Sequence, residues 1–313
     1  MTIILSDAFR AFTSSDPLTY LDAGARGGLE GPWRNADDGR LRVVSFEPDL
    51  ASSRELKADP DHIVVANGLW NAETELDLHL AETASASSVH PPNWDVLSRF
   101  RRQHADPRHT VRKERVACTT VDRVAQKFGM AFDFMKLDTQ GAEYEILEGS
   151  RNELSCNVFG LICETWTQQV HTEQHVTHEV WSYLDSAGFE VVQISVAAAW
   201  QHRIVDTEPI SGRAQLTGLD LLAFRRPSSW PQFTPVRAVK WAAIAELYGY
   251  PDIALELLDS AIAANPEVVQ LTNFRHAIRQ GASPDQLVGR GLFHRLLGRM
   301  RRRSRSSAVK LHY

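Results

Sequence analysis

The chain has 313 residues, of which 43% are hydrophobic and 23% charged, as in globular proteins that bury one large α/β core with an appendage or two modest domains. The formal net charge of −5 and a pI near 6.2 exclude a global electrostatic attraction to nucleic acid or anionic membranes. Three cysteines without a CxxC pair, and apolar stretches shorter than the about 18 residues of a spanning helix, argue against a disulfide framework, a thiolate zinc site and a membrane span. The segment MTIILSDAFR has no basic region before its short apolar patch, so we expect no secretory signal and a cytoplasmic protein.

Short apolar runs rich in β-formers alternate with helical patterns along the first two thirds of the chain. Near-continuous apolar runs that end in polar residues are typical of parallel strands covered on both faces, so the alternation predicts a doubly wound sheet. Two later runs, at 189–195 and 219–226, have no helical pattern between them and predict a closing antiparallel pair. The expected parallel strands are 18–24, 41–48, 62–68, 132–138 and 158–164, and the expected helices are 119–129, 142–150 and 177–188.

The stretch YLDAGARGG follows the first predicted strand directly. In an open α/β sheet, ligands bind beyond the carboxyl ends of the strands. Gly24 and Gly27 allow the backbone to approach a ligand and are expected to supply N–H groups at a helix start, while Asp22 places a carboxylate at the strand end. A carboxylate there is a poor host for a pyrophosphate and suits an ammonium group.

Glu47 ends the second strand about twenty residues later, where an acid accepts hydrogen bonds from both hydroxyls of a ribose. An NAD enzyme shares that acid, so Asp22 is the residue that distinguishes the two cofactors. It favours a cationic amino-acid moiety over a diphosphate. S-adenosylmethionine has both the amine and the ribose. The structural alternative is that Asp22 and Glu47 are helix caps or solvated strand ends.

Five motifs in this order, LDAGARGG, VVSFEPD, VACTTVDRV, FDFMKLDTQGAEYEILEG and GLICE, resemble the FkbM family of S-adenosylmethionine-dependent methyltransferases. The resemblance covers about residues 17–226, and its most distinctive part is KLDTQGAEYEILEG. It implies a Rossmann-like class I methyltransferase fold: a mostly parallel seven-stranded sheet with helices on both faces. A small C-terminal α-helical extension is expected to follow.

The resemblance also implies which residues bind the cofactor, with the turn after the first strand around the methionine part and the ANGLWN stretch near the adenine. Family acceptors are hydroxyls of sugars, glycolipids or polyketides, so it implies an O-methyltransferase that acts on a carbohydrate, glycolipid or related natural product. The implied cofactor set is Asp22, Gly24, Ala25, Gly27, Glu47, Asn67 and Asp138.

Methyl transfer needs a positioned acceptor oxygen and a group that removes its proton. Asp138, at the end of the fourth strand, is the first candidate base, and its structural alternative is to cap the helix that starts near Gly141. Gln140 and Glu143 follow as candidate substrate contacts. Glu164 ends the fifth strand, and with Asp138 it forms a weak alternative site for Mg²⁺, which prefers oxygen ligands.

A long insertion at about 72–115 is expected to form a lid or binding loop. Ser87 and Ser88 match a serine pair that the family often has here, and they are candidate substrate contacts. Trp94 can stack on a sugar face, and His90 is a second candidate base. The alternative for each histidine of the insertion is an ordinary surface residue.

Beyond residue 226 the composition changes. A proline-rich linker at 227–235 precedes two amphipathic helical patterns within 236–282, which resemble a single tetratricopeptide-like hairpin, with a third helix expected at 266–279. One hairpin cannot bury its faces alone, so it is expected to pack on the domain 1–226, on the third helix, or on another subunit in a homo-oligomer.

The tail 283–313 combines apolar residues at helical spacing with many arginines. Such a helix can lie on an anionic membrane surface or bind an acidic protein, which would place the chain at the inner membrane surface; the alternative is a solvated tail. No base-reading motif accompanies the arginines, so nucleic acid is not expected. The competing function is a non-catalytic scaffold that retains a methyltransferase fold and acts through the hairpin and tail.

Overall fold

The computed structural model describes residues 2–36, 39–56, 58–203, 212–231 and 234–281. Its contacts divide the chain into two compact units. The sheet unit is Thr13–Gln232, and the helical unit combines Met1–Phe12 with Phe233–Tyr313. The first twelve residues thus group with the C-terminal helices and not with the rest of the expected domain 1–226.

The sheet unit contains a seven-stranded sheet in the order β3-β2-β1-β7-β8-β10-β9. Pairing is parallel from β3 through β8, and β10 runs antiparallel to both of its neighbours. The predicted mostly parallel sheet with a closing antiparallel pair is therefore confirmed, as a mixed sheet. Its strands are β1 (Leu18–Ala23), β2 (Leu41–Phe46), β3 (His62–Val65), β7 (Phe134–Leu137), β8 (Gly160–Trp166), β9 (Phe189–Trp200) and β10 (Gln215–Arg225).

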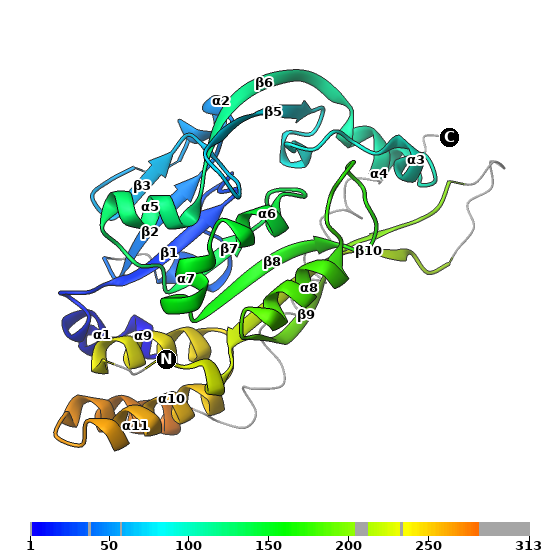
Figure 1. Ribbon diagram of the computed structural model, residues 1–313. Coiled ribbons are helices and arrows are strands. Elements are labelled where there is room, and N and C mark those ends of the chain that lie inside the picture. Colours follow the sequence, from blue (N-terminus) through cyan, green and yellow to red (C-terminus); the bar gives the residue numbers. More distant parts are fainter. Residues whose placement is uncertain (1, 37–38, 57, 204–211, 232–233, 282–313) are drawn as a thin grey trace, which may run out of the picture. The chain divides into compact units, whose positions relative to one another are not determined.

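Four helices lie on the near face of this sheet in Figure 1. They are α5 (Val121–Phe128), α6 (Glu143–Glu148), α7 (Arg151–Cys156) and α8 (Thr177–Ser186). α5 begins where the Thr120 hydroxyl accepts a hydrogen bond from the N–H of Arg123, and it ends at Gly129 in the left-handed region. Leu21, Met135 and Leu161 lie side by side on β1, β7 and β8. Their side chains point toward this face and are fully buried in the main core cluster.

The opposite face carries a shorter element than the sequence predicts. Between β1 and β2 the described residues form no α-helix, only the 3₁₀-helix η2 (Gly31–Asn35). Trp33 of η2 packs on Tyr20 and Phe134, with ring centroids 4.7 and 5.1 Å away. The expected helix start after β1 is therefore wrong, because glycines and Pro32 interrupt helical geometry there. After β2, a single turn of helix follows as α2 (Leu50–Ser53).

The expected lid at 72–115 is an ordered β-structure and not a loop. We call residues 68–119 the arm: a three-stranded sheet of β4 (Gly68–Leu69), β6 (Thr110–Thr119) and β5 (Thr74–Ala81). Alternating residues of β5 and β6 place Leu78, Leu80, Val116 and Cys118 in one small core. The turns η3 (Ala84–Ala86), α3 (Trp94–Leu97), α4 (Arg102–Ala105) and η4 (Asp106–Arg108) connect the two long strands. Figure 1 shows β5 and β6 arching over the end toward which β7 and β8 point.

The helical unit consists of η1 (Ile3–Leu5), α1 (Asp7–Phe12), α9 (Pro235–Leu247), α10 (Pro251–Ala264) and α11 (Val269–Gly281). The predicted hairpin and third helix are present, with an ion pair between Asp259 of α10 and Arg275 of α11. The backbone N–H of Ile3 donates to Glu246 Oε2 of α9 at 2.6 Å. Its likeness to a tetratricopeptide repeat stays a prediction.

The segment before α9 contains a short 3₁₀-helix, η5 (Pro227–Ser229). The whole basic tail, 283–313, and the proposals attached to it lie outside the described residues. In the part of the chain that the structure describes, no helix has the length and apolar character needed to cross a membrane.

Candidate active site

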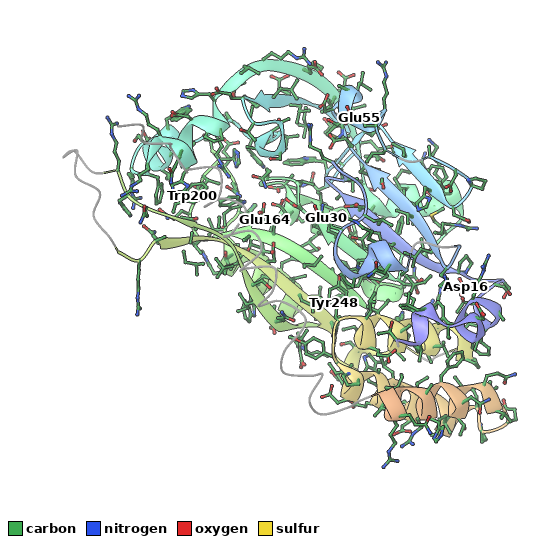
Figure 2. The ribbon with its side chains drawn as sticks, turned by 180° about the vertical axis from the view of Figure 1, so that it is seen from behind. Asp16, Glu30, Glu55, Glu164, Trp200 and Tyr248 are labelled. Atoms are coloured by element: carbon green, nitrogen blue, oxygen red, sulfur yellow. The ribbon has the colours of Figure 1, made fainter. Side chains whose placement is uncertain are left out.

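Four predicted acids lie along the carboxyl edge of the parallel strands. Asp22 is in β1, Glu47 follows β2, Asp138 follows β7 and Glu164 is near the end of β8. Leu137 pairs with Cys163, so Asp138 and Glu164 are level on neighbouring strands. Figure 2 labels Glu164 in this region, with Glu30 of the turn after β1. The sheet order therefore gathers at one edge residues that are up to 142 positions apart in sequence, from 22 to 164.

Asp22 has a cationic partner that the sequence interpretation missed. Lys136 of β7 is directly opposite Asp22 in the register, and its Nζ lies 3.2 Å from Asp22 Oδ1 and 3.7 Å from Asp138 Oδ2. The same ammonium donates to the carbonyl of Gly24 at 2.9 Å. Burial raises the pKa of Asp22, and the two aspartates raise that of Lys136 despite its burial. Two carboxylates facing one ammonium leave one negative charge at this position.

The turn after β1 approaches the loop after β7 so closely that only glycine fits at its start. Gly24 has φ +76°, and a Cβ there would lie 1.9 Å from the carbonyl oxygen of Asp138. The N–H groups of Gly24 and Ala25 both donate to the carbonyl of Phe46 at 3.1 Å. Gly27 has φ +86° with nothing within 4 Å of a Cβ. Asn67 lies partly buried between β3 and β4.

Glu47 is buried, and burial raises the pKa of its carboxyl group. Its Oε1 accepts from the N–H of Asp49 at 3.0 Å, and its Oε2 lies 3.8 Å from Nε of Arg26. Arg26, which the sequence interpretation also missed, donates to Asp49 at 2.8 Å. Asp49, and not Glu47, caps α2. Glu47 thus keeps lone pairs for further donors, as a ribose diol would require.

Asp138 belongs to a network with Gln140 and Glu164. Nε2 of Gln140 donates to Asp138 Oδ1 at 3.3 Å and to Glu164 Oε2 at 2.5 Å. Burial, together with the charge of Asp138, raises the pKa of Glu164 well above its usual range. The Asp138 side chain, in contrast, is 41% exposed. Asp138 does not cap α6, whose N-cap is Ala142.

Glu143, predicted to contact substrate, is occupied by the backbone instead. Its carboxylate accepts from the N–H groups of Thr139 at 2.7 Å and Gly141 at 2.9 Å. Burial raises its pKa to about 7. Gln140 in this turn has φ +61°. Glu143 thus holds a strained turn in place and has no contact to spare for an acceptor.

The serine pair of the arm also has structural contacts. The Ser88 hydroxyl donates to the carbonyl of Gln140 at 2.8 Å and accepts from the N–H of His90 at 3.0 Å. The Ser87 hydroxyl accepts from the N–H of Ala81. Ser88 thereby fixes the arm to the turn that carries Gln140, which brings His90 toward this end of the sheet.

The two other candidates of the arm differ in exposure. His90 is buried, its burial lowers its pKa, and it is therefore neutral. The Trp94 ring is 36% exposed and lies 4.2 Å from the ring of His109. Trp94 is thus available at the surface, whereas His90 faces the interior.

Sequence reasoning missed a second group of residues near Glu164: Arg108, Trp166, His171, Gln174 and Trp200. Three of them come from one polar stretch, TWTQQVHTEQH, which begins with the last two residues of β8. A polar loop at the carboxyl end of a strand next to Asp138 was the available signal. Among the described residues there is no group of three or more His, Cys, Asp or Glu that could hold a metal ion.

The chain is similar to one protein family model and to several solved structures. A family model described as the methyltransferase FkbM domain matches residues 22–191. No curated protein matches the chain. Similar solved structures include a methyltransferase FkbM from Methylobacillus flagellatus KT, with 16% identity, a TM-score of 0.33, and coverage of 66% of this chain and 44% of that one. The match thus spans less than half of that relative.

Two further solved structures are similar at lower identity. The Burkholderia thailandensis 1,6-didemethyltoxoflavin-N1-methyltransferase, solved with S-adenosylhomocysteine, shows 13% identity and a TM-score of 0.30, covering 72% of this chain and 79% of that one. The N-terminal domain of EvdMO1, solved in the presence of SAH and D-fucose, shows 11% identity and a TM-score of 0.32, covering 72% and 83%.

Proposed function

The chain belongs to the FkbM family of methyltransferases and carries its S-adenosylmethionine-dependent methyltransferase domain, and from this premise we propose that it methylates a hydroxyl oxygen of a carbohydrate, glycolipid or related natural product. The observation that carries the proposal is the spacing of charges along one edge of the sheet. Asp22 and Glu47 offer carboxylates at two neighbouring strand ends, and Asp138 follows on the other side of Asp22.

The residues at this edge fit S-adenosylmethionine. The excess negative charge of the Asp22, Lys136 and Asp138 group suits the ammonium of the methionine part. Glu47 suits the ribose hydroxyls, and the open space beside Gly27 allows a close backbone approach. We assign Asp22, Gly24, Ala25, Gly27, Glu47, Asn67 and Asp138 to this binding set.

When bound, S-adenosylmethionine supplies an activated methyl carbon, so the protein has to place the acceptor oxygen and accept its proton. Asp138 is the proposed proton acceptor, because its carboxylate is exposed, whereas burial raises the pKa of its neighbour Glu164. Asp138 would hold the acceptor hydroxyl and take its proton when the oxygen receives the methyl group. Neutral His90 is the second candidate acceptor.

A magnesium ion between Asp138 and Glu164 is the alternative way to acidify the hydroxyl. Two features weigh against it: burial raises the pKa of Glu164, which disfavours the charged form that a metal needs, and the amide of Gln140 already bonds to both carboxyl groups. Methyl transfer that continues after exhaustive chelation would remove the metal from the mechanism, and transfer that stops until Mg²⁺ is restored would establish it.

The proposed function is tested in two steps. Calorimetry measures binding of S-adenosylmethionine, and transfer of a labelled methyl group to a panel of sugars and glycolipids measures activity. We expect binding in the wild type. Asp138→Asn should weaken cofactor binding and, at saturating cofactor, still lose transfer by a factor of about 10²–10⁴. A chain that ignores the cofactor would favour the scaffold function instead.

A further inference from the structure

A group of buried polar side chains lies next to the proposed reaction centre and has no role in binding the cofactor. We call it the Arg108 cluster, defined as Arg108, Trp166, His171, Gln174 and His90. Arg108 comes from η4 of the arm, and its guanidinium carbon lies 5.0 Å from the ring of Trp166 and 4.5 Å from that of Trp200. Trp200 ends β9 and is labelled in Figure 2.

The cluster adjoins the Asp138 network. The Gln174 side chain packs on Gly141, where a Cβ would lie 3.3 Å from it. Gly141 directly follows Gln140, which bonds to Asp138 and Glu164. The N–H of His171 donates to Gln174 Oε1 at 3.1 Å, which links His171 to the same position. An acceptor hydroxyl at Asp138 would therefore leave the rest of its molecule beside these residues.

The cluster contains several buried polar atoms that lack a hydrogen-bond partner. Trp166, His171, Gln174 and His90 are each less than 10% exposed. Among the described residues, no hydrogen-bond partner exists for Nε of Arg108, Nε1 of Trp166, Nε2 of Gln174, Nδ1 of His171 or Nε2 of His90. Buried polar atoms are normally hydrogen-bonded. Three of these five atoms can only donate, so the missing ligand has to supply acceptors.

The charge of the cluster also favours a ligand that supplies hydrogen-bond acceptors. Arg108 stays cationic, because burial lowers its pKa only to about 10. Its one described hydrogen bond runs from Nη1 to the carbonyl of His104, at 3.1 Å. Burial raises the pKa of Glu164, the carboxyl group whose charge acts on Arg108, and burial lowers the pKa of His171 to about 3. A buried cation and a set of unpaired donors together suit an oxyanion.

We propose that the Arg108 cluster is the acceptor subsite and that it binds an oxyanion, a carboxylate or phosphate group, carried by a hydroxylated acceptor such as a sugar acid or sugar phosphate. This inference rests on the proposed function, since it names the class of molecule that the same site methylates. Arg108 binds the oxyanion, and the buried donors of Trp166 and Gln174 complete its hydrogen bonds.

The test measures binding of three probes to the full chain, with and without S-adenosylhomocysteine. Glucuronate and glucose 6-phosphate carry the two oxyanions, and methyl glucoside is the neutral control. Calorimetry gives the affinities. At least one anion should bind about tenfold more tightly than the neutral sugar, the gain of a charge-assisted hydrogen bond. The tighter anion identifies the source of the oxyanion.

Two arginine variants locate the effect. Arg108→Gln should abolish the preference for the anion, and Arg108→Lys should retain part of it. Arg112→Gln removes an exposed arginine of the same arm, whose side chain is 63% exposed, and should leave the preference unchanged. The wild-type comparison of probes stands even where Arg108→Gln does not fold.

Equal binding of neutral and anionic probes by the wild type, or an undiminished preference in folded Arg108→Gln, would overturn the inference. The proposed function fails separately, by absence of cofactor binding. Because the probes are titrated both with and without S-adenosylhomocysteine, the preference for anionic over neutral probes can be measured whether or not the cofactor binds.

Discussion

The two halves of the carboxyl edge balance their charges in different ways. On the side of β1 and β2, each acid has a cation: Asp22 pairs with Lys136, and Glu47 with Arg26. On the side of β7 and β8, Asp138 faces another acid, Glu164, through the amide of Gln140. The first half therefore balances its buried acids with cations, whereas in the second half burial and a neighbouring acid raise the pKa of Glu164 beside an exposed carboxylate.

The largest effect should come from removing the cation of the first half. Lys136→Met leaves buried Asp22 without its main counter-charge, which should lower the free energy of unfolding by about 3–5 kcal/mol. Urea denaturation followed by fluorescence measures it. Lys127→Met, at an exposed position of α5, is the matched control. The double variant Asp22→Asn with Lys136→Met should recover stability but not cofactor binding. If Lys136→Met were as stable as the wild type, Lys136 would not stabilise Asp22, and the proposed difference between the two halves would be wrong.

The contact between the two halves is tested at Gly24. Gly24→Ala combines a positive φ with a Cβ that would meet the carbonyl of Asp138, and it should cost about 2–4 kcal/mol of stability. Gly27→Ala shares the positive φ without the clash and should cost only about 1–2 kcal/mol. Thermal unfolding of both variants gives the difference. Equal costs would mean that the close approach of the β1 turn to Asp138 is not a constraint.

The second half predicts a pH dependence. Burial raises the pKa of Glu143 from 4.5 to about 7, so between these pH values the folded state binds more protons than the unfolded state. Stability therefore falls as pH rises through this window. Glu143→Gln cannot titrate, so its decline between pH 4.5 and 8 should be smaller by about 1–3 kcal/mol. Denaturation at several pH values measures this, with exposed Glu73→Gln as control. Parallel pH curves would contradict the assignment.

The smallest effect belongs to the ribose position of the first half. Glu47→Gln keeps an acceptor oxygen but loses the charge, and cofactor binding should weaken by about 1–2 kcal/mol, roughly tenfold, without loss of the fold. Calorimetry with S-adenosylmethionine measures it. Affinity equal to that of the wild type would remove Glu47 from the cofactor site and leave only Asp22 in the first half.

The first half could be predicted from sequence because its acids stand in short motifs at strand ends. Asp22 and Glu47 each follow an apolar run, and the order of these runs is the order of the elements. The counter-charges were not predictable in this way, because Lys136 reaches Asp22 only through the pairing of β1 with β7. Register between strands distant in sequence depends on packing of the whole sheet.

The second half was predictable only in part. Asp138 and Glu164 were identified as a pair, but Gln140, placed by a positive φ, was assigned to substrate instead of to the link between them. The arm was expected to be a loop, since its proline and serine content masked the alternation of β5 and β6. Arg108 and His171 come from separate elements and influence each other only through the tertiary structure, which no local sequence pattern predicts.

The construction of the helical unit has a consequence for biosynthesis. Ile3, Ile4 and Phe9 are buried in the described structure, and their unit is completed by helices that begin at residue 235. A ribosome makes the first of these residues more than two hundred positions before the last partner emerges. The leading segment therefore lacks its partner helices, and its apolar side chains stay uncovered, during most of translation. Chaperones that recognise exposed apolar segments have the longest time to bind it in this period.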